Sequence, residues 1–240
     1  MVARVSRRLS RAWDPFRFDL NLLRELSGIV WPEGRDTRRR SAAMDLRLAG
    51  ADEAGRGCLA GPLVAAAVIL DYARAPFPGL EDLTDSKVLS ARARESLYPL
   101  ILRSAVRVSW VACSPSTIDE DGLHRCNLSA LARALENLRG EYRLALVDGF
   151  ELAFPQLRAQ AVKGGDHRSA AVAAASVVAK VVRDRLMRAL APLYPDYGFE
   201  EHVGYGTERH MEALRRHGPC TLHRRSFQGV AAPQLELWEE

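Results

Sequence analysis

The stretch Ala49-Gly50-Ala51-Asp52-Glu53-Ala54-Gly55-Arg56-Gly57 ends one apolar run with two adjacent carboxylates and then turns through Gly-Arg-Gly. A second apolar run, Leu63 to Leu70, follows the Gly61-Pro62 pair. We predict two paired strands, Leu46–Asp52 and Leu63–Leu70, joined by this turn. Acids at a strand end are poorly placed for packing, and a glycine-flanked arginine lets the backbone approach an anion. The stretch therefore indicates metal-dependent chemistry on a phosphate-bearing substrate.

The composition predicts one sizeable folded domain, because 240 residues with 48% hydrophobic and 27% charged side chains can bury a core. No apolar run approaches the length of about 18 residues that a membrane span needs. The basic start, Met1 to Arg4, is followed by no apolar segment typical of a signal peptide. The cysteines are scattered without a C-x-x-C pair, which disfavours zinc and a disulfide framework. We therefore expect a cytoplasmic protein without membrane contact.

The net charge of +4 is concentrated at the N-terminus. Residues 1–50 hold 11 Arg and 6 acidic residues, whereas the other 190 residues hold 23 basic and 24 acidic ones. Any polyanion contact in the body must therefore come from local patches. The Arg38-Arg39-Arg40 run is either a solvated loop or a nucleic-acid contact. Only 3 basic residues are lysines, namely Lys87, Lys163 and Lys180, and a compact ammonium is needed where a guanidinium does not fit.

Apolar periodicity and capping signals predict an α/β domain with helices packed around one sheet. The further predicted strands are Val106–Cys113, Leu144–Gly149 and Leu157–Val162. The predicted helices are Phe18–Leu26, Ala91–Leu102, Leu128–Leu138, Ala170–Leu190 and Thr207–His217. Ser90 caps the second helix, whereas Gly28 and Gly218-Pro219 end the first and the last. Residues 114–119 are predicted to form a turn, and the tail from Gln228 onward is expected to be loosely attached.

Three acids share one setting, since Asp52, Asp148 and Asp166 each follow an apolar run and adjoin a glycine-rich turn. If the three runs are neighbouring strands, their ends form one acidic cluster, which repels itself and needs protons or divalent cations. Oxygen ligands without His or Cys favour Mg²⁺ or Mn²⁺. Two such ions about 3.5–4 Å apart promote phosphodiester cleavage. For any single acid, a capping or salt-bridging role is the alternative.

Glu53 poses a geometric problem, because successive strand residues point to opposite faces of a sheet. Asp52 and Glu53 converge only if the chain bends between them. The turn at Gly55 could supply that bend.

Two other groups of side chains do not predict a separate chemistry. His202, His210 and His223 have a spacing that fits no compact metal site, so we assign them solvent-exposed or structural roles. The Ser86-Lys87 pair suggests a nucleophile with its base. We interpret Lys87 instead as a phosphate contact or an organiser of the acids.

Eight motifs in this order closely resemble those of the ribonuclease HII family. They are Asp52-Glu53-Ala54-Gly55-Arg56-Gly57, Asp85-Ser86-Lys87, Val147-Asp148-Gly149, Lys163-Gly164-Gly165-Asp166, Ala173–Lys180, Arg183-Asp184-Arg185, His202–Thr207 and His223–Phe227. The resemblance covers about residues 46–228. It implies a ribonuclease H-like fold, with a mixed sheet flanked by helices and a C-terminal helical portion. The chain then divides into a basic, partly helical extension (1–45), a catalytic domain (46–228) and a tail (229–240).

The resemblance also implies a metal-dependent endoribonuclease. Such an enzyme cleaves the RNA strand of RNA–DNA hybrids, and it cuts 5′ of ribonucleotides embedded in duplex DNA, leaving 3′-hydroxyl and 5′-phosphate ends. In the family the matched acids are catalytic and bind two ions, Mn²⁺ or Mg²⁺; here they are Asp52, Glu53, Asp148 and Asp166. We expect a monomer, and a sliding clamp is a candidate partner for the tail. The alternative is a non-catalytic nucleic-acid binding module.

The substrate-binding residues that the resemblance implies are Gly55, Arg56, Gly57, Lys87, Lys163, Ser176, Lys180 and Tyr205. Among them, the Gly-Arg-Gly turn reads the 2′-hydroxyl, which separates RNA from DNA. Tyr205 stacks on the sugar beside the cut. Without the resemblance, a lone tyrosine between glycines is more simply a loop anchor.

The chain departs from the family's pattern at several positions. Cys58 stands where proline is common. Val203 stands where lysine is common before the Gly-Tyr pair, which removes one phosphate contact. The Gly164-Gly165 pair leaves the fourth acid open between Asp166 and Asp184. We favour Asp184 as a structural partner of a neighbouring arginine, because it sits inside a long predicted helix.

Overall fold

The computed structural model describes residues 14–27 and 46–230. Its strands are β1 (Arg47–Ala54), β2 (Leu63–Asp71), β3 (Arg107–Cys113), β4 (Leu144–Asp148) and β5 (Ala159–Val162). Its helices are α1 (Pro15–Ser27), α2 (Ala91–Ser104), α3 (Pro115–Asp121), α4 (Leu123–Glu136), α5 (Gly165–Arg168), α6 (Ala170–Leu190), α7 (Phe199–His202) and α8 (Glu208–His217). Short 3-10 helices lie at Tyr72–Arg74, Pro155–Leu157, Ala191–Leu193 and Pro195–Tyr197. The predictions for residues 1–13, 28–45 and 231–240, including the Gly28 helix stop and the Arg38–Arg40 run, lie outside the described residues.

The strands form one mixed sheet in the order β3-β2-β1-β4-β5. β1 and β2 pair antiparallel from Arg47↔Asp71 to Ala54↔Val64, which confirms the predicted strand pair. β3 is antiparallel to β2, whereas β4 is parallel to β1 and β5 is parallel to β4. Because β1, β4 and β5 run in the same direction, their carboxyl ends lie at the same edge of the sheet.

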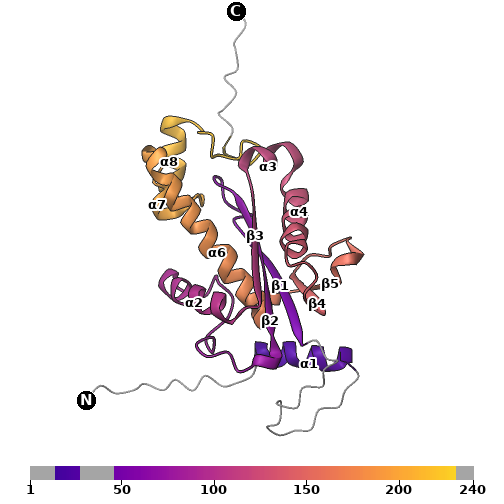
Figure 1. Cartoon of the computed structure of the whole chain (residues 1–240). Coiled ribbons are helices and arrows are strands. Elements are labelled where there is room, and N and C mark those ends of the chain that lie inside the picture. Colours follow the sequence, from indigo (N-terminus) through magenta and orange to yellow (C-terminus); the bar gives the residue numbers. More distant parts are fainter. Residues whose placement is uncertain (1–13, 28–45, 231–240) are drawn as a thin grey trace, which may run out of the picture.

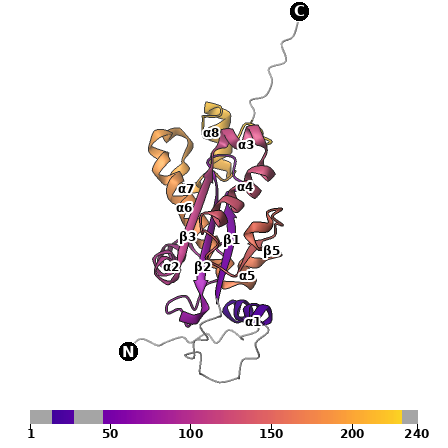
Figure 2. The ribbon, with the colours of Figure 1, turned by 45° about the vertical axis from the view of Figure 1, so that its right-hand side comes forward.

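Helices cover both faces of the sheet (Figures 1 and 2). Leu48 and Val64 belong to the face that packs against α6 and α2, and Ala49 and Ala65 belong to the face that packs against α4. This alternation follows from the two-residue period of a strand. With both faces covered, β2 is buried at every position except Asp71, which explains its unbroken apolar sequence. The expected α/β fold with helices around a mixed sheet is confirmed.

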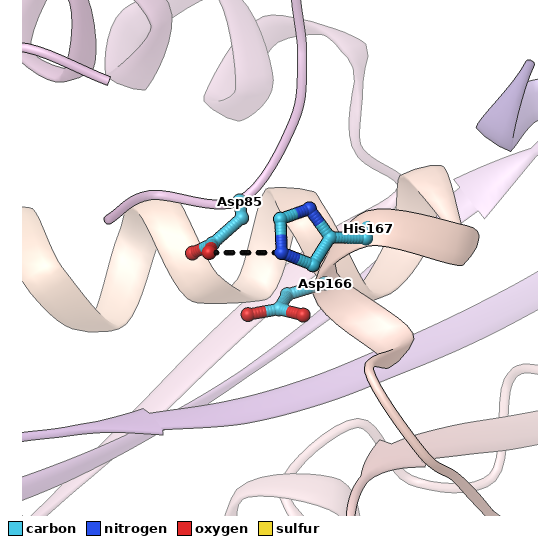
Figure 3. A group of neighbouring side chains, drawn as sticks. All are labelled: Asp85, Asp166 and His167. Atoms are coloured by element: carbon cyan, nitrogen blue, oxygen red, sulfur yellow. Dashed lines mark ion pairs between the residues drawn. The ribbon is translucent and has the colours of Figure 1, made fainter. Parts of the chain in front are cut away.

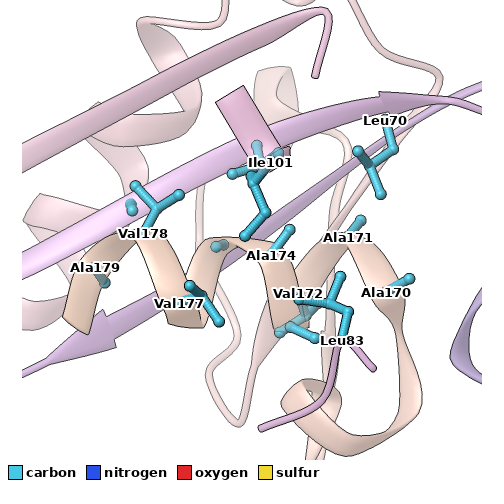
Figure 4. Packing of buried hydrophobic residues seen from close by; sticks show 14 of the residues in the cluster. Leu70, Leu83, Ile101, Ala170, Ala171, Val172, Ala174, Val177, Val178 and Ala179 are labelled. Carbon is cyan, nitrogen blue, oxygen red and sulfur yellow. The ribbon is translucent and has the colours of Figure 1, made fainter. Parts of the chain in front are cut away.

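Helix α6 lies very close to β1 because both surfaces carry small residues. Figure 4 shows Ala170, Ala171 and Ala174 of α6 packed among larger aliphatic side chains. A Cβ at Gly50 would lie 2.1 Å from the carbonyl carbon of Ala171, so only glycine fits there. The Ser169 hydroxyl accepts a hydrogen bond from the Val172 N–H at 3.3 Å and caps the helix.

No helix within residues 14–27 and 46–230 has both the length and the apolar character to cross a membrane.

Several predicted boundaries were wrong for local reasons. The predicted turn at 114–119 is helix α3, because the Ser114 hydroxyl caps it by accepting from the Thr117 N–H at 3.1 Å. Helix α4 begins at Leu123 rather than Leu128, since its first turn is polar and its apolar period shows only later. The tail was expected to be loose from Gln228 onward, but the chain remains packed as far as Val230, which is 1% exposed.

Helix α1 of the N-terminal extension packs against the domain. The carboxylate of Asp19 is buried, and its Oδ2 accepts hydrogen bonds from the Tyr72 hydroxyl and, at 3.0 Å, from the Ala171 N–H at the start of α6. The rings of Phe16 and Phe77 stack with centroids 5.6 Å apart. Leu23 is 1% exposed and joins the core on the α6 face.

Leu23→Ala is therefore expected to lower the free energy of unfolding by about 2–5 kcal/mol, because it leaves a cavity beneath α1. Leu26 lies on the same helix but is 43% exposed, so Leu26→Ala is the matched control and should cost less than about 0.5 kcal/mol. Urea unfolding of both variants measures the difference. Equal losses for the two leucines would contradict the docking of α1.

Candidate active site

The ends of β1 and β4 bring two acids together. Ala51 pairs with Val147 in the parallel register, so the next step along both strands places Asp52 beside Asp148 on the same face. Asp148 Oδ1 accepts a hydrogen bond from the Gly165 N–H at 2.7 Å. This bond ties the start of α5 to the end of β4.

Asp166 reaches the same place by a glycine-dependent turn after β5. Gly164 has a φ of 63°, a left-handed conformation that glycine adopts easily, and α5 begins at the next residue. Asp166 is buried, and its carboxylate has an oxygen within 4.8 Å of ligand oxygens of both Asp52 and Asp148. The three acids predicted from strand ends therefore converge.

The electrostatics of this cluster favour a bound cation. Burial raises the pKa of Asp52 well above its usual range, and the charges of Glu53 and Asp148 raise it further. Burial also raises the pKa of Asp148, with a contribution from Asp166. Carboxylates that are hard to ionise side by side require protons or divalent cations. Because all the donors are oxygen, hard cations fit the cluster.

Glu53 lies on the opposite face of β1 from Asp52. The strand stays paired with β2 as far as Ala54, so the chain does not bend between the two acids as the sequence had suggested. The nearest cation is Arg56, whose Nε lies 3.8 Å from Glu53 Oε1. Burial raises the pKa of Glu53 to about 7, although Arg56 opposes this shift. Glu53 Oε2 is buried without a hydrogen-bond partner among the described residues, which leaves it available to a ligand.

Asn127 is a neighbour of Glu53 that the sequence interpretation missed. It is fully buried on α4, and neither its amide oxygen nor its amide nitrogen has a hydrogen-bond partner within the described part of the chain. The amide makes no bond of hydrogen-bond geometry to Glu53, but it lies near enough to lower the pKa of Glu53, against the effect of burial. The available signal was an amide in line with the apolar residues of α4. The predicted helix began at Leu128, so Asn127 fell outside it.

Asp166 also belongs to a second group of side chains, with Asp85 and His167 (Figure 3). Asp85 is buried, and its Oδ2 lies 3.3 Å from Nε2 of the more exposed His167. Lys87 Nζ lies 3.4 Å from Asp166 Oδ2, and its side chain is 75% exposed. Although burial opposes it, the nearby carboxylates, Asp166 foremost, raise the pKa of Lys87. Lys87 thus contributes a positive charge at the mouth of the acidic cluster.

The Gly-Arg-Gly turn is closely packed at its first glycine and open at its second. Gly55 has a φ of 93°, and a Cβ there would lie 2.0 Å from Nε of Arg183. Gly57 is exposed, and a Cβ there would meet no described atom within 4 Å. The Cys58 N–H closes the turn by donating to the Gly55 carbonyl at 3.3 Å, a bond that proline at this position could not make.

Tyr205 lies beside two cations of α6. Lys180 Nζ is 4.9 Å and Arg183 Cζ is 5.7 Å from the centroid of its ring, and Tyr205 is 39% exposed. Arg183 is fully buried and donates to three backbone carbonyls, those of Pro62, Val203 and Ala60. It therefore joins residues 203–207 between α7 and α8, here called the Tyr205 loop, to the segment after the Gly-Arg-Gly turn.

The remaining residues of the predicted site occupy different settings. Ser176 is buried, its hydroxyl lies 2.8 Å from that of Ser86, and it lowers the pKa of Asp52. Lys180 Nζ donates to Asp184 Oδ1 at 2.7 Å. Lys163 is exposed in the turn after β5.

Asp184 lies among cations and not with the three converging acids. Besides Lys180, its carboxylate faces Arg94, whose Nη2 lies 3.9 Å from Asp184 Oδ2. Of the two candidates for the fourth acid, the geometry groups Asp166 with Asp52 and Asp148.

Known proteins provide an independent comparison. The family model described as Ribonuclease HII matches residues 49–230. A Ribonuclease HII of Azorhizobium caulinodans is 52% identical over 192 residues, which cover 80% of this chain and 72% of the relative. A Ribonuclease HII of Xanthobacter autotrophicus is 48% identical over 204 residues, covering 84% and 80%.

Solved structures show the same architecture. Ribonuclease H2 from Pyrococcus horikoshii OT3 matches with a TM-score of 0.66 and 26% identity over 77% of this chain and 95% of that one. The RNase HII of Archaeoglobus fulgidus, solved as a complex with PCNA, matches with a TM-score of 0.63 and 29% identity over 75% and 95%. A Bst-RNase HIII in complex with Mn²⁺ shares the fold, with a TM-score of 0.59, 18% identity and coverage of 86% and 78%.

Proposed function

The chain belongs to the ribonuclease HII family, and we propose that it cuts 5′ of ribonucleotides embedded in duplex DNA as well as within RNA–DNA hybrids. The family consists of divalent-metal-dependent ribonucleases H that act on RNA–DNA hybrids, so the chain is a ribonuclease H endonuclease. The observation that carries the finer proposal is the convergence of Asp52, Asp148 and Asp166 within one cluster. The open side of the turn at Gly57 lies one short segment along the chain from Asp52.

The donor set fits two divalent cations, Mg²⁺ or Mn²⁺. Asp52, Asp148 and Asp166 supply carboxylate oxygens within 4.8 Å of one another. Glu53 lies on the other face of β1, but the charge of Asp148 still raises its pKa, so we add to the donor set its buried Oε2, which has no partner among the described residues. When bound, two such ions supply an activated water and stabilise the leaving oxygen, which yields 3′-hydroxyl and 5′-phosphate ends.

The rest of the site binds and orients the nucleic acid. Gly57 leaves the backbone of the turn open to the 2′-hydroxyl. Arg56 precedes it in the turn, and its guanidinium lies over the Phe150 ring, 4.8 Å from the centroid. Lys87 and Lys163 present exposed ammonium groups to phosphates. Tyr205 offers a partly exposed ring for stacking on the sugar. The ammonium group of Lys180 lies 4.9 Å from the centroid of that ring, and the Ser176 side chain lowers the pKa of Asp52.

The proposed organisation of the chain follows the resemblance. Residues 46–228 form the catalytic domain, residues 1–45 a basic extension anchored by α1, and residues 229–240 a tail. The PCNA complex of the Archaeoglobus fulgidus relative supports the proposal that a sliding clamp contacts the tail. We further propose that the enzyme acts as a monomer in the cytoplasm, on DNA that carries ribonucleotides.

A cleavage assay on three end-labelled substrates tests the proposal. With Mg²⁺ or Mn²⁺, the protein should cut a long RNA–DNA hybrid and a DNA duplex with one ribonucleotide, and should spare plain RNA. Its products should carry 3′-hydroxyl and 5′-phosphate ends, and a chelator should abolish them, since the acids alone activate no water. Binding with a steep salt dependence but without any cut would identify a non-catalytic binding module instead.

A further inference from the structure

A chain of hydrogen bonds runs through two buried histidines to the backbone of Tyr205. His210 Nδ1 lies 2.8 Å from the Tyr205 carbonyl oxygen, which only accepts, so this nitrogen carries the proton. His210 Nε2 must then accept from His223 Nε2, 3.0 Å away. His223 Nδ1 in turn accepts from the Cys220 N–H at 3.0 Å. Every partner is satisfied by two neutral rings, each in one defined tautomer.

A third histidine holds the other side of the same loop. The ring of His202 stacks on that of His210, with centroids 4.4 Å apart. His202 Nδ1 accepts from the Gly204 N–H at 3.2 Å, and its Nε2 donates to the Tyr197 carbonyl at 2.7 Å. The Tyr205 N–H donates to the His202 carbonyl at 2.9 Å. The sequence indicated that these histidines form no metal site, and their nitrogens bond to the protein. It did not predict that the three rings lie together.

Burial keeps the rings of His210 and His223 neutral. His210 and His223 are 0% and 2% exposed and lie against the ring of Phe199. Burial lowers the pKa of His210, and it lowers the pKa of His223 from 6.5 to about 4. Protonating His210 would place an Nε2–H against the Nε2–H of His223 across their 3.0 Å contact. Protonating His223 would place an Nδ1–H against the Cys220 N–H, 3.0 Å away. The chain of hydrogen bonds is therefore intact at neutral pH.

The segment that carries His223 also holds the Gly-Arg-Gly turn. The backbone of His223 pairs with Ala60, and the next residue, Arg224, donates through Nη1 to the Arg56 carbonyl at 3.0 Å. The Gly204 carbonyl accepts from the Leu59 N–H at 3.0 Å. One short C-terminal segment thus connects the turn and the Tyr205 loop.

We propose that His210 and His223 are positioning residues, which act as a hydrogen-bonded pair that holds Tyr205 in place against the sugar of the substrate. The inference rests on the proposed function, because it requires Tyr205 to face the substrate. Neither histidine touches the substrate or the acids, so the pair acts only through the Tyr205 backbone. The Tyr205 ring is partly exposed, and among the described residues the pair contacts Tyr205 by the hydrogen bond of His210 to its carbonyl oxygen.

A double-mutant cycle with Tyr205→Ala tests the inference on a duplex that carries one ribonucleotide. His210→Leu should lower kcat/KM by about tenfold in the wild-type background, the effect of losing one buried hydrogen bond. In the Tyr205→Ala background the same change should have almost no effect, because no ring remains to be positioned. His210→Asn keeps an amide N–H where Nδ1–H stood, and should restore kcat/KM to within about threefold of wild type.

The outcomes separate the two proposals. Equal losses in both backgrounds, or no loss with His210→Leu, would overturn the positioning role and leave the ribonuclease activity standing. A wild-type protein that cuts no ribonucleotide substrate would overturn the proposed function itself. If His210→Leu fails to fold, as judged by its melting curve, His223→Leu replaces it. That change removes the donor to His210 and the acceptor of the Cys220 N–H, but leaves the bond of His210 to the Tyr205 carbonyl in place. Its expected loss is about threefold, again only when Tyr205 is present.

Discussion

Asp148→Asn should lower the rate of RNA-strand cleavage by about 10³-fold or more, equivalent to about 4 kcal/mol of transition-state stabilisation. The amide oxygen of asparagine can still accept from the Gly165 N–H, now 2.7 Å from Asp148 Oδ1, so the local fold is retained. The negative charge that faces Asp52 and Asp166 is lost. Burial already makes ionisation of Asp148 unfavourable, so the metal-free variant should melt no lower than wild type. Single-turnover cleavage in Mg²⁺ and a melting curve measure both effects.

Asp184→Asn is the matched control for this experiment. Asp184 is buried between Lys180 and Arg94, so the change leaves two cations without their partner. It should cost about 3–5 kcal/mol of stability, while the folded fraction keeps its cleavage rate to within about tenfold. A rate loss at Asp184 as large as that at Asp148 would mean that Asp184, and not Asp166, is the fourth acid of the site.

Gly50→Ala is expected to lower the stability strongly. A Cβ at this position would lie 2.1 Å from the carbonyl carbon of Ala171, 2.2 Å from its oxygen and 2.2 Å from the Val172 nitrogen. These are backbone atoms in the first turn of α6, so no side-chain rotation relieves the overlap. Moving the helix away from β1 should cost about 3 kcal/mol or more and lower the Tm by roughly 6–12 °C.

Gly57→Ala is the control for the added methyl group. No described atom lies within 4 Å of the position of its Cβ, so the Tm should stay within about 1 °C of wild type. Its kcat/KM on a single embedded ribonucleotide should fall, because the methyl group occupies the open side of the turn. A Tm loss at Gly57 as large as that at Gly50 would contradict the close approach of α6 to β1.

Much of the fold could be predicted because its signals are local. The strand pair around Gly55 and the cap at Ser90 depend on neighbouring residues, and both appear in the structure. The acids Asp52 and Asp148 follow directly from parallel strands whose ends share an edge. A residue that ends a strand has little freedom in where it lies.

Other features depend on contacts between distant segments. Whether Asp166 or Asp184 joins the acids is decided by how α5 and α6 pack on the sheet, which no spacing in the sequence encodes. The face of Glu53 is decided by how far β1 stays paired with β2. Asn127 becomes a neighbour of Glu53 only once α4 covers that face.

The sequence by itself therefore determined the strands, the two strand-end acids and the glycine turn, since each follows from periodicity and backbone conformation over a few residues. Tertiary structure alone decided the grouping of His202, His210 and His223. These residues lie on different elements, and they meet because Tyr197 and Phe199 bury them in one apolar cluster. A hydrogen bond between two imidazoles needs nitrogens 3.0 Å apart, and only the packing of whole elements sets that distance.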